Sequence, residues 1–241
     1  MINWKFSLYQ FKMKIRDWIL SKGNPFGVLN FSPQHKCMIN QSPIDFVLHV
    51  GADKGQESYF YEYLGVRMVI WIEPDKRTFP NLEKRVNKHT RSQQIAINKL
   101  VSQFDGAKLY LNLYTISGAN SVHELNEVRT LPGKSIPTGT RVLFESTTIS
   151  RIIEEQKLDF TTLGKSLLVL DIQGHELAAL KGMKKEHLDN FNLIMCEVSK
   201  IEIYRNAATF KEIHDFLTQR NFKLIFEGKR RSYDDMIYKK I

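Results

Sequence analysis

Residues 46–55 read F-V-L-H-V-G-A-D-K-G, an apolar run that ends at a glycine, with a second glycine four positions later. The next apolar run, R-M-V-I-W-I at 67–72, is followed directly by Glu73. A continuous apolar run before a glycine turn is typical of a buried parallel strand that leads into a helix. An acidic residue after the second strand of such a unit can accept hydrogen bonds from ribose hydroxyls. The two runs therefore predict an α/β fold with a nucleotide-type ligand at its first turn.

Short apolar runs alternate with helical patterns over most of the chain beyond residue 44. We expect strands at 45–50, 67–72, 94–98, 167–172 and 193–198, and helices at 56–64, 78–87, 176–183 and 210–220. This alternation predicts a mostly parallel, twisted sheet with helices on both faces. Residues 223–226 and 236–239 predict an antiparallel hairpin at the C-terminal edge of that sheet.

The chain divides into an N-terminal extension, residues 1–43, and one domain, residues 44–241. Residues 1–22 lack glycine and proline and predict a basic, aromatic helix, which we expect to pack as a lid on the core. The alternative is a surface helix that contacts a partner or an anionic membrane. A polar connector is expected up to residue 43. Within the domain, residues 102–150 break the alternation and predict an insertion with a half-exposed strand at 108–114.

Composition excludes several classes of protein. A hydrophobic content of 42% and a charged content of 25% indicate a globular chain, and two cysteines do not form a disulfide framework. No apolar stretch is long enough to span a bilayer and no secretory signal is evident, so we expect a cytoplasmic protein, with membrane-peripheral contact through residues 1–22 as an alternative. The lysine and arginine residues that give the net charge of +9 are scattered along the sequence. Because no nucleic-acid-binding motif accompanies them, we do not expect a nucleic-acid partner.

The glycine spacing narrows the class of ligand. We expect Gly51 to let a ligand approach the backbone and Gly55 to open the helix with free N–H groups. The G-A-D-K-G turn lacks the second close glycine of the dinucleotide fingerprint. This difference favours S-adenosylmethionine over NAD.

Six segments resemble the FkbM family of S-adenosylmethionine-dependent methyltransferases, over most of residues 44–240. They are H-V-G-A-D-K-G-Q-E-S at 49–58, W-I-E-P at 71–74, A-I-N at 96–98, S-G-A-N-S at 117–121, L-V-L-D-I-Q-G-H-E-L-A-A-L-K-G at 168–182 and I-M-C-E-V at 194–198. The resemblance implies a Rossmann-like class I methyltransferase fold. It also implies O-methylation of a hydroxyl on a sugar, a glycan or a small metabolite.

The resemblance also implies roles for individual residues. The cofactor-binding residues would be Gly51, Ala52, Asp53 and Gly55 around the methionine part, Glu73 and Pro74 around the ribose, Ala96 and Ile97 near the adenine, and Asp171 near the transferred methyl group. The chain departs from the family at His49, where an aspartate is usual, and at Gln173, where a glutamate is usual.

Three residues at expected strand ends are candidates for the base that removes a hydroxyl proton: Asp171, His175 and Glu197. His175 has a side chain suited to proton transfer at neutral pH, although a helix-capping role is the alternative. The three could also form a site of mixed nitrogen and oxygen ligands for a divalent metal. A metal is not expected, because the resemblance does not require one.

The S-G-A-N-S loop of the insertion supplies candidate acceptor contacts. Ser117, Asn120 and Ser121 carry groups that can hydrogen-bond a hydroxyl-bearing small molecule or glycan, with a plain turn as the alternative. Two other functions stay open. The basic charge would suit a methyltransferase of RNA ribose, and a non-catalytic module could bind S-adenosylmethionine without turnover.

Overall fold

The structure is a computed structural model that describes residues 32–89, 91–126, 135–229 and 233–241. The helix expected at 1–22 lies outside these residues, so its packing stays a prediction. The expected connector contains a helix that was not predicted, α2 (Pro33–Asn40). The helix begins where the hydroxyl of Ser32 accepts a hydrogen bond from the His35 amide, with proline in its first turn.

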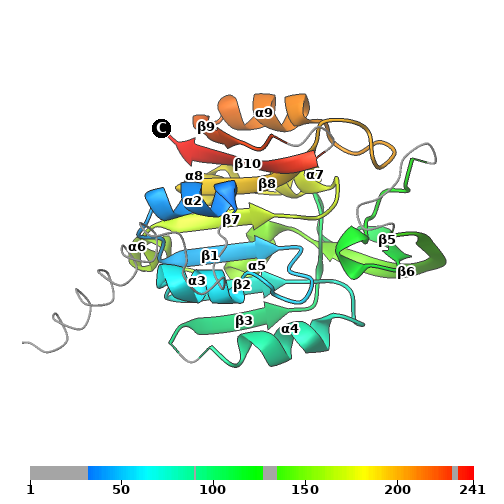
Figure 1. Ribbon diagram of the computed structural model, residues 1–241, viewed down its shortest axis with the longest axis horizontal. Helices are drawn as coiled ribbons and strands as arrows, with labels where there is room; N and C mark the ends of the chain where they lie inside the picture. The colour runs from blue at the N-terminus through cyan, green and yellow to red at the C-terminus, as the bar shows by residue number, and fades with distance from the viewer. Residues whose placement is uncertain (1–31, 90, 127–134, 230–232) are drawn as a thin grey trace, which may run out of the picture.

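The central sheet has seven strands in the order β3-β2-β1-β7-β8-β10-β9 (Figure 1). Their bounds are Phe46–Val50 for β1, Met68–Ile72 for β2, Gln93–Ile97 for β3, Ser166–Leu170 for β7, Leu193–Ser199 for β8, Phe222–Glu227 for β9 and Tyr233–Lys240 for β10. The first five strands in this order are parallel, and β10 pairs antiparallel with both β8 and β9. The expected C-terminal hairpin is confirmed, with β9 as the edge strand.

Helices cover both faces of the sheet, as expected. Within each strand, successive side chains enter opposite cores: Val47 and Val69 pack on one side, Leu48 and Ile70 on the other. The first core includes α2, α3 (Ser58–Leu64) and α4 (Phe79–Val86). The second includes α5 (Ile149–Glu155), α7 (Glu176–Lys181), α8 (Lys185–Asp189) and α9 (Phe210–Thr218), and a short α6 (Phe160–Leu163) packs against it. Among the described residues, none of the helices combines the length and apolarity needed to cross a bilayer.

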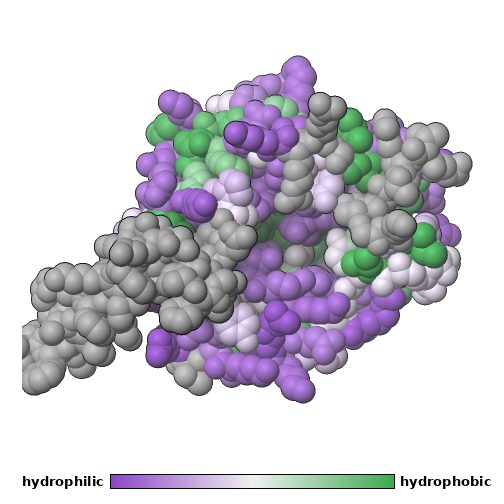
Figure 2. Space-filling model, viewed as in Figure 1, coloured by the Kyte–Doolittle hydropathy of each residue, from purple (hydrophilic) through white to green (hydrophobic). Residues whose placement is uncertain are grey.

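The insertion and the two residues before it form a second, three-stranded sheet in the order β4-β6-β5, with β4 at Leu100–Val101, β5 at Lys108–Tyr114 and β6 at Pro137–Thr147. Figure 1 shows β5 and β6 beyond the carboxyl ends of the parallel strands. The expected strand at 108–114 is confirmed, and its alternating burial agrees with the period-two pattern. Exposed hydrophobic side chains of the insertion include Ile136, just before β6, and Leu143 within β6. In the view of Figure 2, hydrophobic patches occur on the side where Figure 1 shows β5 and β6.

Candidate functional site

Two cavities lie side by side at the carboxyl ends of the parallel strands. The first cavity, of about 790 Å³, is lined by the turns after β1, β2 and β7. The second cavity, of about 720 Å³, lies between the turn after β7, the end of β8 and the 3-10 helix η1 (Ser117–Ala119). Gly118, Asp171 and Gln173 line both. This edge is where open α/β sheets bind ligands, and the shared wall would let two bound molecules meet.

Gly51 is required by the protein's own backbone. Its φ is +86°, and a Cβ there would lie 1.8 Å from the carbonyl oxygen of Asp171. The turn after β1 therefore packs directly on the turn after β7, which explains the glycine without the ligand that we expected it to admit. Gly51 and Ala52 both line the first cavity, so a ligand would lie against this compact backbone.

Gly55 does not belong to the first cavity, in contrast to its expected role. Its amide donates to the carbonyl of Ala52 at 2.7 Å, and helix α3 begins only at Ser58. A Cβ at Gly55 would lie 2.7 Å from Cδ1 of Leu82 on α4. The second glycine of the motif thus allows helix packing and presents no free N–H group to a ligand.

Glu73 is held firmly at the end of β2. Its carboxylate accepts the amide of Asp53 through Oε2 and the amide of Asp75 through Oε1, each at 2.8 Å. The side chain is 7% exposed and lines the first cavity beside Pro74. Burial raises the pKa of Glu73 to about 7, although the two amides oppose this shift. Each oxygen keeps a second lone pair with which it can accept a hydrogen bond from a ligand.

The structure separates the two residues expected near the adenine from the first cavity. Ala96 and Ile97 lie in β3 and are not part of the lining of the first cavity. Residues that follow β3 in the sequence do line the first cavity: Lys99, Leu100 and Val101. Leu100 and Val101 form β4, a strand of two residues that is too short to produce a recognisable sequence pattern.

A carboxyl pair bridged by an amide forms the shared wall. Nε2 of Gln173 donates to Oδ1 of Asp171 at 2.7 Å and to Oε2 of Glu197 at 2.6 Å. Burial raises the pKa of Asp171, and burial together with the charge of Asp171 raises the pKa of Glu197 well above its usual value. The two carboxyl groups also hydrogen-bond each other. Of the two, Glu197 is the more readily protonated, because the charge of Asp171 adds to the rise in its pKa, whereas the hydrogen bonds from Gln173 and Glu197 oppose the rise in the pKa of Asp171.

Glu176, which sequence reasoning missed, shapes this turn. Its Oε1 accepts the amides of Ile172 at 3.0 Å and Gly174 at 3.1 Å. Gln173 and Gly174 both have positive φ, so the chain needs such a tie to keep this conformation. Burial raises the pKa of Glu176 to about 7. Glu176 lies inside the segment 168–182 that resembles the FkbM family, and this was the signal in the sequence that could have revealed it.

His175 is tied to two neighbours and not to the carboxyl pair. Its Nε2 lies 2.9 Å from Oγ of Ser102, and its Nδ1 lies 3.2 Å from Nε2 of His123. Burial first, and then His123, lowers the pKa of His175 to about 4, so the ring stays neutral at neutral pH. It is the N-cap residue of α7, as the alternative predicted, but its side chain makes no capping hydrogen bond. Both nitrogens have protein partners, which does not favour His175 as the base.

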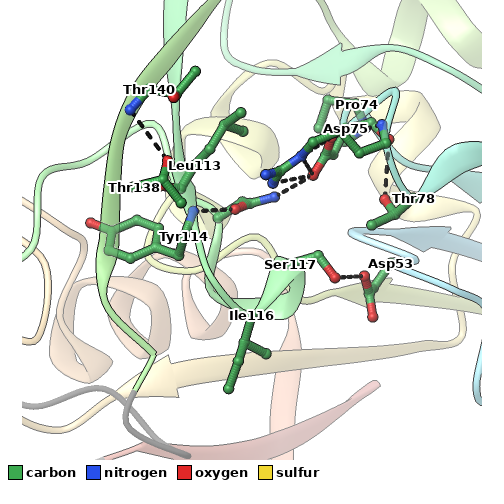
Figure 3. Close-up of polar contacts among 12 residues, drawn as sticks. Asp53, Pro74, Asp75, Thr78, Leu113, Tyr114, Ile116, Ser117, Thr138 and Thr140 are labelled. Atoms are coloured by element: carbon green, nitrogen blue, oxygen red, sulfur yellow. Dashed lines mark hydrogen bonds and ion pairs between the residues drawn. The ribbon is translucent and has the colours of Figure 1, made fainter.

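The three polar residues expected to bind an acceptor each bind a different turn of the core. Oγ of Ser117 donates to Oδ1 of Asp53 at 2.6 Å, Nδ2 of Asn120 donates to Oδ2 of Asp75 at 2.8 Å, and Oγ of Ser121 donates to the carbonyl of Gln173 at 2.8 Å. Figure 3 shows the Ser117–Asp53 contact with Asp75 nearby. Loop 116–121 therefore closes over the first cavity by joining all three turns.

His49 is a buried strand residue. Its Nδ1 lies 2.9 Å from the Tyr61 hydroxyl, and its ring stacks on Trp71 with 5.2 Å between centroids. Burial lowers the pKa of His49 to about 3, so the imidazole is neutral. It lines the first cavity but offers a ligand neither positive nor negative charge.

The metal alternative finds no support in the arrangement. Across the described ranges, no three histidine, cysteine, aspartate or glutamate side chains converge on a point where they could hold a metal ion. Asp171 and Glu197 do converge, but the ring nitrogens of His175 contact Ser102 and His123 instead.

Comparison with known proteins places this architecture in a family. No curated protein matches the sequence. Similar solved structures include TehB from Haemophilus influenzae (9% identity over 93% of this chain and 66% of that chain, TM-score 0.49). They also include a protein of the NADB-Rossmann superfamily from Streptococcus agalactiae (11%, 88% and 69%, 0.47) and TrmK from M. capricolum with S-adenosylhomocysteine (10%, 87% and 69%, 0.46). At these identities and scores, the likenesses carry no argument about ligand or reaction.

A family model gives the assignment. The model described as the methyltransferase FkbM domain matches residues 49–224, which include the turns after β1, β2 and β7 and the end of β8. The resemblance and the Rossmann-like class I fold that it implied are confirmed. The chain belongs to the FkbM family of S-adenosylmethionine-dependent methyltransferases.

Proposed function

We propose that the protein transfers a methyl group to a hydroxyl of a sugar, a glycan or a small metabolite, with Asp171 as the base. The observation that carries the proposal is the position of Asp171 in the wall between the two cavities, where Gln173 and Glu197 fix its carboxylate. A base for this reaction must reach the acceptor hydroxyl while that hydroxyl faces the methyl donor.

The residues of the first cavity fit S-adenosylmethionine, which when bound supplies a methyl group on a positively charged sulfur. Glu73 offers two carboxylate oxygens to a ribose diol at the end of β2. Ile72, Leu100 and Val101 provide apolar surface for an adenine ring. Asp53, Glu57 and Asp171 supply negative charge on the side of β1 and β7, which suits a cationic ligand.

Proton transfer would run through Asp171. Because Glu197 is the more readily protonated of the two carboxyl groups, the carboxylate of Asp171 would accept the hydroxyl proton as the methyl group is transferred. Gln173 donates to both carboxyl groups through one amide nitrogen and so fixes their relative orientation. A glutamate at position 173 could not donate in this way when ionised.

The second cavity supports a hydroxyl-bearing acceptor. Its lining combines apolar groups with polar ones, and two of the polar groups are the carboxyl groups of Asp171 and Glu197. The remaining members are Ile116, Gly118, Ala119, Gln173, Gly174, Ser199, Ile203 and Tyr233. Aromatic and aliphatic surface next to hydroxyl and carboxyl groups suits the mixed faces of a sugar or a small alcohol.

The test separates binding from chemistry. The wild type and Asp171→Asn would be titrated with S-adenosylhomocysteine and then incubated with S-adenosylmethionine and a panel of glycans and small alcohols. Formation of methyl ether would be followed by mass spectrometry. We expect the variant to bind the product cofactor but to lose about 100-fold or more in turnover, as removal of a general base requires. Full turnover by Asp171→Asn, or methylation at nitrogen only, would contradict the proposal.

A further inference from the structure

One carboxyl group in the first cavity has no structural task. Glu57 precedes α3 and makes no side-chain capping hydrogen bond, and its side chain lines the cavity. The other acidic residues there are engaged: Asp53 accepts from Ser117, Glu73 from two backbone amides, and Asp171 from Gln173. Among the described residues, no ion pair or side-chain hydrogen bond joins Glu57 to another residue.

The surroundings of Glu57 are unfavourable to its charge. Burial, together with the charges of Asp171, Asp53 and Asp235, raises the pKa of Glu57 to about 7, while only its own backbone amide lowers it. These three acids come from the turns after β7 and β1 and from β10. A half-buried carboxylate that lacks a cation costs free energy, which a positively charged ligand would offset.

We propose that Glu57 binds the α-ammonium group of the methionine part of the cofactor, an inference that rests on the proposed function. The cofactor has two positive centres. The sulfonium must face Asp171 and the second cavity for methyl transfer, which leaves the ammonium group for an acid outside the shared wall. Glu57 lines the first cavity only, at the end of the turn that contains Gly51 and Asp53. His49, which is neutral and bound to Tyr61, cannot provide this charge.

Two ligands isolate the ammonium contact. S-adenosylhomocysteine carries the ammonium group but no sulfonium, and 5′-methylthioadenosine lacks the amino-acid part altogether. We expect Glu57→Gln to weaken binding of S-adenosylhomocysteine about tenfold or more, as loss of one partner of a desolvated charge pair does. Binding of 5′-methylthioadenosine should not change. Calorimetric titration of the full-length chain measures both, and Glu57→Asp should recover part of the loss.

Glu83→Gln is the matched control, since Glu83 is an exposed acid on the neighbouring helix α4. It should leave both affinities unchanged. Equal weakening of both ligands by Glu57→Gln would show a merely structural role, and an unchanged affinity for S-adenosylhomocysteine would show no role; either result overturns the inference. A larger loss for S-adenosylmethionine than for S-adenosylhomocysteine would also overturn it, because Glu57 would then face the sulfonium. If the wild type bound none of these ligands, the proposed function itself would fail.

Discussion

The turns of the core and loop 116–121 of the insertion enclose the same cavity but are built differently. The core turns contain Gly51, Asp53 and Gln173 at positive φ and place buried carboxylates against backbone amides. Loop 116–121 has no residue at positive φ and contacts the core through the neutral side chains of Ser117, Asn120 and Ser121. The core turns therefore fix the charges of the site through the fold itself, whereas the loop adds closure through single hydrogen bonds.

The comparison is tested most strongly by Gly51→Ala. The new Cβ would collide with the carbonyl oxygen of Asp171 at 1.8 Å in a backbone conformation that alanine disfavours. We expect a loss of about 3 kcal/mol or more in the free energy of unfolding, from overpacking and strain together. Denaturant unfolding measures this loss.

Gly65→Ala is the control for the collision. Gly65 also has a positive φ, of +76°, but no atom lies within 4 Å of a Cβ built there. Its substitution should cost about 1–2 kcal/mol, the strain alone. Equal losses at the two positions would mean that the close approach of the two turns does not matter for stability.

The next prediction concerns the buried acids of the core turns. Because the folded state raises the pKa of Glu176 from 4.5 to about 7, its contribution to stability is complete below the unfolded pKa and is lost as pH rises through about 7. Glu176→Gln keeps an Oε1 atom for the two amides that the glutamate accepts. Relative to wild type, the variant should gain on the order of 2 kcal/mol between pH 4.5 and 8.

Thermal unfolding of both proteins at several pH values provides the measurement. Glu73 and Glu57 also have pKa values raised to about 7 by burial, so the wild type should lose stability over this range even apart from Glu176. Parallel curves for wild type and Glu176→Gln would contradict the assignment of a raised pKa to Glu176.

The same contrast explains how far the sequence could predict the molecule. Strands β1, β2, β7 and β8 were predictable because each buries a nearly continuous apolar run, and the motif from Asp171 to Gly174 lies where expected at the end of β7. Gly51 was found for a partly wrong reason, because collision with a backbone carbonyl cannot be seen in a linear pattern. The two-residue strand β4 is too short to form a pattern, and α2 fully buries only Met38, so neither element could be predicted.

The site could be predicted only in part, for a related reason. Side chains such as Asp171, Glu73 and Glu197 were found because they end apolar strands. The roles of Asn120 and His175 depend on partners 45 and 73 positions away in the sequence, which no local spacing encodes. Glu57 was missed because it ends no strand. The burial and the neighbouring acids that raise its pKa come together only when β1, β7 and β10 are assembled in the sheet.

The smallest expected effect on stability comes from the loop. Asn120→Ala removes the hydrogen bonds to Asp75 and to the amide of Tyr114, with an expected loss of about 1 kcal/mol. Because the bond to Asp75 joins the loop to the core, affinity for S-adenosylhomocysteine should fall as well. Asp75→Asn, which acts on the same contact from outside the lining of the first cavity, should reproduce part of that fall.

Thr138→Ala provides the contrast within the insertion. Its hydroxyl donates to the carbonyl of Leu113 and accepts the amide of Thr140, away from Asp53 and Ser117 in Figure 3. We expect a similar loss of stability without a loss of affinity, because these bonds stay within the insertion. If Asn120→Ala also left the affinity unchanged, loop 116–121 would contribute stability alone, and closure of the first cavity would belong entirely to the turns of the core.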